Sequence, residues 1–311
     1  METSYALPYY APRDSLPAPL PTVEEIENAR DGIKHSWSHR IVRVGTHFVV
    51  KYGIGVQTME GENMLFVKES APSLVVPNVY AIFSRVQGEE GKGNDGNTDP
   101  ITINYIVMEY IPGRTLDSCW SRLDDATKTK VVAKLRDYFY QLRQVPSPGY
   151  FGAVGRRPFC DDGFVWHRED DEPESISSGP FDSEEQLLDA LIAKYEFHSG
   201  SLLQGDRRHE YYRYMLPQVL RSGESVFTHG DLQRKNVMIR EDNGGGGYYR
   251  LGIGGVVPGL VGVLLDHVLL PVEGRLASLG GSDPGRVSES VRLDDDDLSV
   301  IMCFWDEITP F

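Results

Sequence analysis

The stretch that decides the fold lies in the second half of the chain and reads Phe227-Thr228-His229-Gly230-Asp231-Leu232-Gln233-Arg234-Lys235-Asn236-Val237-Met238. It predicts a polar loop, because apolar residues stand on both sides and a strand can begin at Val237. A carboxylate such as Asp231 accepts the proton of an attacking hydroxyl, and an amide oxygen such as that of Asn236 reaches a magnesium ion. An isolated Asp-x4-Asn would more simply stabilise a turn, so the rest of the chain has to decide between the two interpretations.

The elements before this loop come in the order that a two-lobed kinase requires. The spacing of Asp231 and Asn236 matches the kinase catalytic loop His-Arg-Asp-x-x-x-x-Asn. Periodicity first predicts a hairpin, a helix and two further strands, over Arg40–Tyr52, Thr58–Ser70, Val75–Phe83 and Ile101–Tyr110. It then predicts three helices, over Asp124–Val145, Ser183–Ser199 and His209–Ser222. We therefore predict an α+β protein with a two-lobed protein-kinase-like fold, a small β-rich N-terminal lobe and a larger α-helical C-terminal lobe.

The lobe boundaries follow from the same patterns. Residues 1–22 hold five prolines and few charges, which predicts an extended arm. Thr22 is then a candidate N-cap for a short helix over Val23–Arg30. We expect an N-terminal nucleotide-binding lobe over residues 23–111 and a helical C-terminal lobe with the catalytic loop over residues 112–311.

Composition and charge exclude several classes of protein. Apolar residues at 40% and aromatic residues at 10% are too many for a disordered chain. No apolar run of about 18 residues predicts a membrane-spanning helix. With 31 Lys and Arg against 46 Asp and Glu, the net charge of −15 argues against nucleic acid as a partner and suits a cationic substrate. Three unpatterned cysteines and an N-terminus without a secretory signal favour a cytoplasmic location.

Lys51 ends the apolar run Phe48-Val49-Val50. In a kinase-like lobe a lysine at this place reaches the α- and β-phosphates of the nucleotide, whereas elsewhere it is an ordinary strand end. The lysine needs an acidic partner on the next helix to hold it in place. Glu60 and Glu62 both qualify by position.

Several stretches, in order along the chain, carry a family resemblance. They are Leu20-Pro21-Thr22, Val49-Val50-Lys51-Tyr52-Gly53, Val107-Met108-Glu109-Tyr110-Ile111-Pro112-Gly113, Gly179-Pro180-Phe181 and the His229-Gly230-Asp231 loop. From about Leu20 to Arg240 the chain resembles the aminoglycoside phosphotransferase and choline kinase-like family, most of all its fungal branch of unassigned function. The resemblance implies a phosphotransferase that uses ATP and Mg²⁺ and a small-molecule hydroxyl compound as acceptor.

The resemblance also assigns individual roles. It implies that Asp231 is the catalytic base and that Asn236 holds metal. The family's glutamate sits six residues before an aromatic, and Phe66 makes that residue Glu60, which leaves Glu62 on a solvated helix face. Met108, Glu109, Tyr110 and Ile111 resemble the hinge whose backbone holds the adenine. Arg43–His47 is expected to be the phosphate-covering loop, without a glycine repeat, and His35, His39 and His47 are expected to lie at the surface.

The resemblance ends near Gly254. A kinase of this fold needs a second metal-binding Asp on a strand soon after the catalytic loop. Residues 254–290 are instead rich in Gly, Val and Leu. The nearest substitute is Asp266, which follows the apolar run Val261–Leu265. A translated intron or a frameshift would explain such a segment, as would a true insertion, and we expect it to be loosely packed.

Two functions follow from these observations. The first is a phosphotransferase that moves the γ-phosphate of ATP to a hydroxyl of a small molecule, with Lys51, Asp231, Asn236 and Asp266 at its centre. An acidic stretch after Cys160, with Asp161 and Asp162, suits a cationic acceptor, although a solvated loop is the simpler interpretation. The alternative is a kinase-like pseudoenzyme, or a truncated or mistranslated family member, that binds nucleotide or a partner without turnover.

Overall fold

The computed structural model describes residues 5–87, 100–159, 178–199, 208–219, 225–229, 234–239 and 261–265. By its contacts the chain divides into two compact units. The first comprises residues 122–232 together with 260–311 and the first two residues, and the second comprises residues 3–121 together with 233–259. The N-terminal unit therefore includes the end of the predicted catalytic loop, which the expected boundaries 23–111 and 112–311 assigned to the other lobe.

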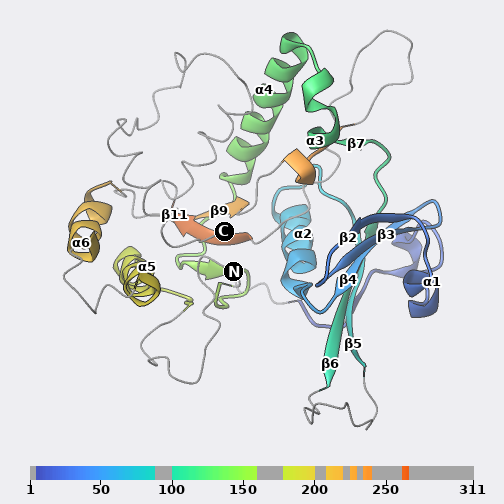
Figure 1. Ribbon diagram of the computed structural model, residues 1–311, viewed down its shortest axis with the longest axis horizontal. Coiled ribbons are helices and arrows are strands. Elements are labelled where there is room, and N and C mark those ends of the chain that lie inside the picture. The colour runs from blue at the N-terminus through green and yellow to red at the C-terminus, as the bar shows by residue number, and fades with distance from the viewer. Residues whose placement is uncertain are drawn as a thin grey trace. The chain divides into compact units, whose positions relative to one another are not determined.

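The N-terminal unit is built on a six-stranded antiparallel sheet with the strand order β1-β5-β6-β4-β3-β2 (Figure 1). Side chains alternate along β4, where Phe48, Val50 and Tyr52 are buried and join the core with Val42 and Val107. This alternation is the two-residue period of a strand with one face in the core. The strands span Tyr9–Tyr10 (β1), Gly32–His35 (β2), Arg40–Val44 (β3), Phe48–Gly53 (β4), Val79–Gln87 (β5) and Ile101–Glu109 (β6).

Two helices flank this sheet. Helix α1 (Val23–Glu27) begins at Thr22, whose side chain and that of Glu25 form a reciprocal capping box, so the predicted N-cap is confirmed. Helix α2 spans Thr58–Ser70, as predicted, and packs against β5 and β6 (Figure 1). A Cβ at Gly61 would lie 2.7 Å from Cδ1 of Ile82, so the helix approaches the sheet most closely at this glycine.

The N-terminal segment is part of the fold rather than a free arm. Strand β1 pairs with β5, and the backbone N–H of Ala11 donates to the carbonyl of Tyr80 over 2.9 Å. Leu16 and Leu20 pack against the core of the sheet. Proline content indicated an extended backbone, but it did not reveal that apolar residues between the prolines would cover the sheet edge.

A small second sheet ties the end of the predicted catalytic loop to the N-terminal unit. Strand β7 (Arg114–Thr115) pairs with β10 (Met238–Ile239), and Leu116 N–H donates to the Val237 carbonyl over 2.7 Å. Helix α3 (Leu116–Cys119) and the 3-10 turn η2 (Trp120–Arg122) follow β7, and the 3-10 turn η4 (Arg234–Asn236) precedes β10. Val237 and Ile239 are buried, which confirms the predicted anchor strand after the loop.

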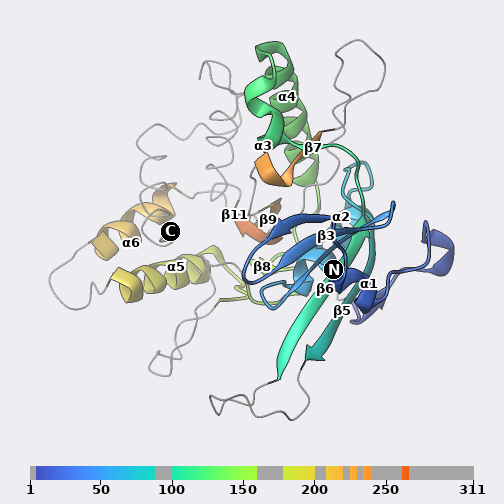
Figure 2. The same ribbon diagram turned by 45° about the vertical axis from the view of Figure 1, so that its right-hand side comes forward.

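The other unit is helical with one three-stranded sheet. Its helices are α4 (Asp125–Leu142, capped by Asp124), α5 (Glu184–Ser199) and α6 (Arg208–Val219), and Figures 1 and 2 show α5 and α6 side by side. The sheet has the order β8-β11-β9, with β8 over Gly152–Ala153, β9 over Ser225–His229 and β11 over Val261–Leu265. The apolar run Val261–Leu265 is thus a strand. The remainder of 254–290, and with it the expected loose packing, lies outside the described residues.

Candidate functional site

Lys51 and Glu60 form an ion pair at the centre of the N-terminal unit. Lys51 lies in β4, opposite Ile41 of β3 and Ile106 of β6, and Glu60 lies in the first turn of α2. The Lys51 Nζ donates to Oε2 of Glu60, and their side chains are 14% and 10% exposed. The predicted partnership of the two residues is confirmed. A cation that is held in place and partly shielded from water suits the binding of an anionic phosphate group.

Glu62 does not lie on a solvated helix face. Its residue is 1% exposed, and its Oε1 accepts a hydrogen bond of 3.3 Å from Oγ1 of Thr58. Helix α2 packs against β5 and β6, and the hydroxyl of Tyr5 in the N-terminal segment donates to Glu69 of the same helix over 2.8 Å. Burial, followed by this hydrogen bond, raises the pKa of Tyr5.

The turn that lies next to Lys51 is Ser36–His39, between β2 and β3. Because β3 and β4 are antiparallel, Lys51 is opposite the beginning of β3, whereas Arg43–His47 lies at the other end of the pair. Gly55 N–H donates to the carbonyl of Ser38 over 2.9 Å, and a Cβ at Gly53 would lie 2.3 Å from that oxygen. The assignment of the phosphate-covering loop to Arg43–His47 is therefore wrong for the geometry around Lys51.

His39 is half-buried and lies in the turn next to Lys51. Burial lowers its pKa, and the nearby charges of Lys51, Lys34 and Lys235 lower it further. His39 is partly exposed, and His35 and His47 are exposed, in agreement with the expected surface positions.

The predicted hinge residues form the end of β6 and the segment after it. Met108 and Ile111 are buried, and Glu109 is fixed by Asn78, whose backbone N–H and Nδ2 donate to its Oε2 over 3.2 and 2.7 Å. The N–H of Glu109 donates to the Asn78 carbonyl, and the N–H of Tyr110 donates to the His47 carbonyl, both over 2.8 Å. These two N–H groups are therefore occupied within the protein.

The residues predicted to hold metal are described in part. Asn236 ends the turn η4 and is half-buried, with Val237 N–H donating to the Arg234 carbonyl over 3.3 Å. Asp231 and Asp266 lie outside the described residues, two residues after the end of β9 and directly after β11. Within the described part of the chain no group of three His, Cys, Asp or Glu is placed to hold a metal ion. An amide oxygen fits Mg²⁺ that arrives with a nucleotide, since Mg²⁺ takes few protein ligands and completes its shell with phosphates and water.

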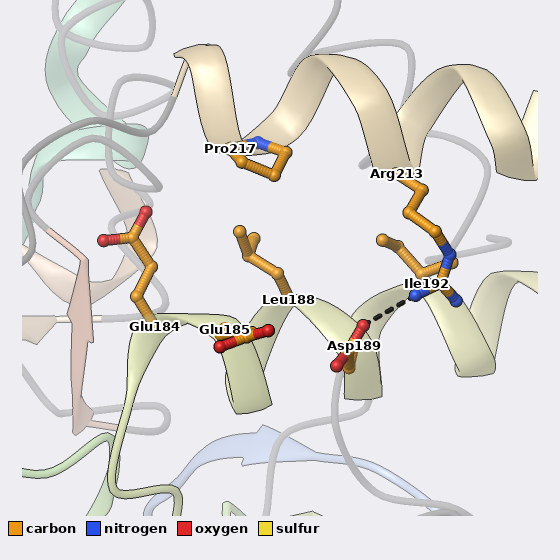
Figure 3. Close-up of a pocket in the computed structure, with 7 residues that line it drawn as sticks. All are labelled: Glu184, Glu185, Leu188, Asp189, Ile192, Arg213 and Pro217. Atoms are coloured by element: carbon orange, nitrogen blue, oxygen red, sulfur yellow. Dashed lines mark hydrogen bonds and ion pairs between the residues drawn. The ribbon is translucent and has the colours of Figure 1, made fainter.

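A separate pocket opens between α5 and α6 in the helical unit (Figure 3). It has a volume of about 620 Å³, with an apolar floor of Leu188, Ile192 and Pro217. Three carboxylates and one guanidinium also line it: Glu184, Glu185, Asp189 and Arg213. Arg213 donates to Oδ1 of Asp189 over 2.7 Å, as Figure 3 shows, so the pocket keeps a net negative charge. Sequence reasoning missed it, because these carboxylates look like an ordinary solvated helix face.

The described part of the chain contains no helix long and apolar enough to span a membrane. The antiparallel sheet with α2 across it and the helical unit together define a protein-kinase-like fold. The chain matches, over residues 32–247, the model of the phosphotransferase enzyme family, and it belongs to that family. No curated protein matches it.

Among solved structures, the chain is similar to a thermostable mutant of aminoglycoside phosphotransferase APH(4)-Ia in its apo form. The two share 14% identity over 92% of each chain, with a TM-score of 0.50. A ternary complex of that enzyme with AMP-PNP and hygromycin B gives 14% identity, 92% and 86% coverage of this chain and that chain, and a TM-score of 0.47. The GDP complex of aminoglycoside 2'-phosphotransferase-IIIa gives 12% identity, 89% and 82% coverage and a TM-score of 0.43. The likeness to the first of these, at a TM-score of 0.50, shows the fold.

Proposed function

We propose that the protein transfers the γ-phosphate of ATP to a hydroxyl group of a small molecule. The observation that carries the proposal is the shielded ion pair of Lys51 and Glu60, in a chain of the phosphotransferase family. A lysine so placed binds the α- and β-phosphates, and its carboxylate partner keeps the ammonium in position during the transfer. The turn Ser36–His39 adjoins this lysine and contributes backbone groups to the same phosphates.

The contact between the proposed hinge and the adenine ring depends on which backbone N–H groups of the hinge already donate hydrogen bonds within the protein. The N–H groups of Glu109 and Tyr110 donate within the protein, so the N–H of Ile111 is the donor of this segment that we assign to the adenine ring. The buried side chains of Met108 and Ile111 give this segment a fixed backbone. Side-chain identity therefore matters less here than the backbone geometry.

In the proposed reaction Asp231 accepts the hydrogen of the acceptor hydroxyl and orients its oxygen for attack on the γ-phosphorus. Asn236 holds Mg²⁺ through its amide oxygen, with Asp266 as the second proposed ligand. When bound, Mg²⁺ neutralises charge that develops on the phosphate oxygens. Positioning and charge neutralisation supply most of the rate enhancement in such a transfer, so few reactive groups are required.

We propose a cationic acceptor, because the pocket between α5 and α6 is lined by Glu184, Glu185 and Asp189 around an apolar floor (Figure 3). Carboxylates attract amines, and Leu188 and Ile192 would pack against the carbon skeleton of such a compound. The net charge of −15 favours the same class of acceptor. A location in the cytoplasm, where ATP is available, is part of the same proposal.

The experiment is a comparison of nucleotide binding and phosphotransfer with matched lysine variants. Lys51→Ala should weaken MgATP binding or lower turnover without unfolding the protein, whereas Lys68→Ala, at an exposed position of α2, should change neither. Turnover is measured as ADP release with a panel of hydroxylated amines, including aminoglycosides and choline. Nucleotide binding without transfer to any acceptor would support the alternative of a pseudoenzyme. Equal nucleotide affinity together with equal turnover of the parent and Lys51→Ala would refute the site.

A further inference from the structure

Arg234 makes a side-chain contact that the catalytic-loop pattern does not explain. It lies two residues before Asn236 in the turn η4, and its Cζ is 5.7 Å from the centroid of the Trp120 ring. Its Nε is 3.8 Å from Oδ1 of Asp117. Trp120 and Asp117 belong to the segment α3–η2 that follows β7, so the contact joins the turn of Asn236 to a helix elsewhere in the sequence.

The backbone hydrogen bonds around η4 fix the residues that follow it more firmly than the turn itself. The pairing of β10 with β7 and the Leu116–Val237 hydrogen bond hold residues 237–239. The turn is a three-residue 3-10 helix, closed by a long bond of 3.3 Å between Val237 N–H and the Arg234 carbonyl. Such turns have poor hydrogen-bond geometry, so a side-chain contact has much influence on how they are oriented.

We propose that Arg234 is a positioning residue that sets the orientation of Asn236 toward the metal of the bound nucleotide. The guanidinium lies within cation–π range of the indole ring while Asp117 attracts its Nε edge, and we take these two contacts to orient the start of η4. Asn236 follows two residues later, so a rotation at Arg234 would move its amide oxygen away from the metal. The inference rests on the proposed function, because it takes Asn236 as a ligand of Mg²⁺.

The two contacts with Trp120 and Asp117 require an arginine at position 234. A guanidinium is planar and weakly hydrated, so it lies flat on an indole ring and still presents an N–H edge to a carboxylate. A lysine would keep the charge but would lose one of the two contacts. Removal of a residue that orients a metal ligand, without binding the metal itself, typically changes metal affinity by about 10–100-fold.

The test measures ADP affinity twice, with Mg²⁺ and with EDTA, and takes the ratio of the two dissociation constants. In Arg234→Ala and Trp120→Leu we expect the gain from Mg²⁺ to fall about tenfold while the affinity in EDTA stays unchanged. Arg234→Lys should lie between the parent and Arg234→Ala. The double variant should be no worse than either single one, because the two changes remove one contact.

The matched control is Arg156→Ala in the helical unit. Arg156 also lies over an aromatic ring, at 5.5 Å from the Tyr150 centroid, and pairs with Asp182, so its removal is the same chemical change at another place. Its Mg²⁺ ratio should equal that of the parent.

Equal loss of affinity with Mg²⁺ and with EDTA in Arg234→Ala would mean a structural role and overturn the inference, as would an unchanged ratio. Should Arg234→Ala fail to fold, Arg234→Lys decides by the same ratio. An absence of any Mg²⁺ effect in the parent protein would instead refute the proposed role of Asn236 itself.

Discussion

Replacement of Glu60 by glutamine tests the ion pair of Lys51 most directly. The change keeps the size of the side chain and one acceptor oxygen but removes the negative charge. A hydrogen bond to a charged group contributes about 1.5–3 kcal/mol, whereas a neutral one contributes about 1 kcal/mol. The two side chains are 14% and 10% exposed, so the pair lies between a surface and a buried ion pair. We therefore expect Glu60→Gln to lower the free energy of unfolding by about 1–2 kcal/mol, which corresponds to a fall of roughly 1.5–3 °C in Tm for a chain of 311 residues.

The effect on catalysis should be larger than the effect on stability. In Glu60→Gln the ammonium of Lys51 still attracts phosphates, but its position is no longer fixed. Misplacement of a reacting group by about 1 Å can cost about 10²-fold in rate. We expect kcat for phosphotransfer to fall by about this factor, while the dissociation constant for MgATP changes less.

Glu62→Gln is the matched control, because it makes the same chemical change two residues away on the same helix. Glu62 is buried, so its replacement should also lower Tm. It should leave kcat and nucleotide affinity unchanged, since Glu60 and not Glu62 pairs with Lys51. The reasoning would be refuted by equal losses of kcat in the two variants, or by full activity of Glu60→Gln.

Three further outcomes are expected. Asp231→Asn should lower phosphotransfer by about 10²–10⁴-fold and leave nucleotide binding nearly intact, and activity within about twofold of the parent would exclude its role as base. Gly53→Ala should lower the unfolding free energy by about 1–3 kcal/mol and weaken ATP binding, because its Cβ would meet the Ser38 carbonyl at 2.3 Å with φ at +148°. Gly45→Ala, with open space around it, should lower stability less and leave ATP binding unchanged. Because the pKa of His39 is lowered from 6.5 in the folded protein, stability should fall as pH drops below about 6.5, and His39→Gln should flatten this fall in pH-dependent thermal melts.

Local periodicity was sufficient for most elements of the fold. Helix α2 has the predicted bounds Thr58–Ser70, and the hairpin of β3 and β4 has the predicted turn. Strand β2 was missed because Gly32–His35 shows no alternation, and in the structure it is an exposed edge strand. An edge strand of this kind is held by backbone hydrogen bonds to one neighbour, which leave little trace in the side chains.

The choice between Glu60 and Glu62 shows which part of the ion pair could be predicted from the sequence. Position on the helix allowed either residue to face Lys51, and the family resemblance selected Glu60, which the ion pair confirms. Nothing in the local sequence indicated that Glu62 is buried. The same helix is reached by the N-terminal segment from more than fifty residues away, where Tyr5 donates to Glu69. Tertiary contacts of this length are invisible to helical periodicity.

The position of a residue within its strand also determines which turn it can work with. Lys51 lies near the end of β4, and each strand residue advances the chain by about 3.3 Å. Six residues separate it from Gly45, so the turn between β3 and β4 is too remote for one phosphate group to touch both. The turn that precedes β3 is the near one, because the antiparallel register sets Ile41 opposite Lys51 and Arg40 opposite Tyr52. Register arithmetic of this kind needs only the hairpin that hydrophobic periodicity predicts, so the amino-acid sequence is sufficient to assign Ser36–His39 to the neighbourhood of Lys51.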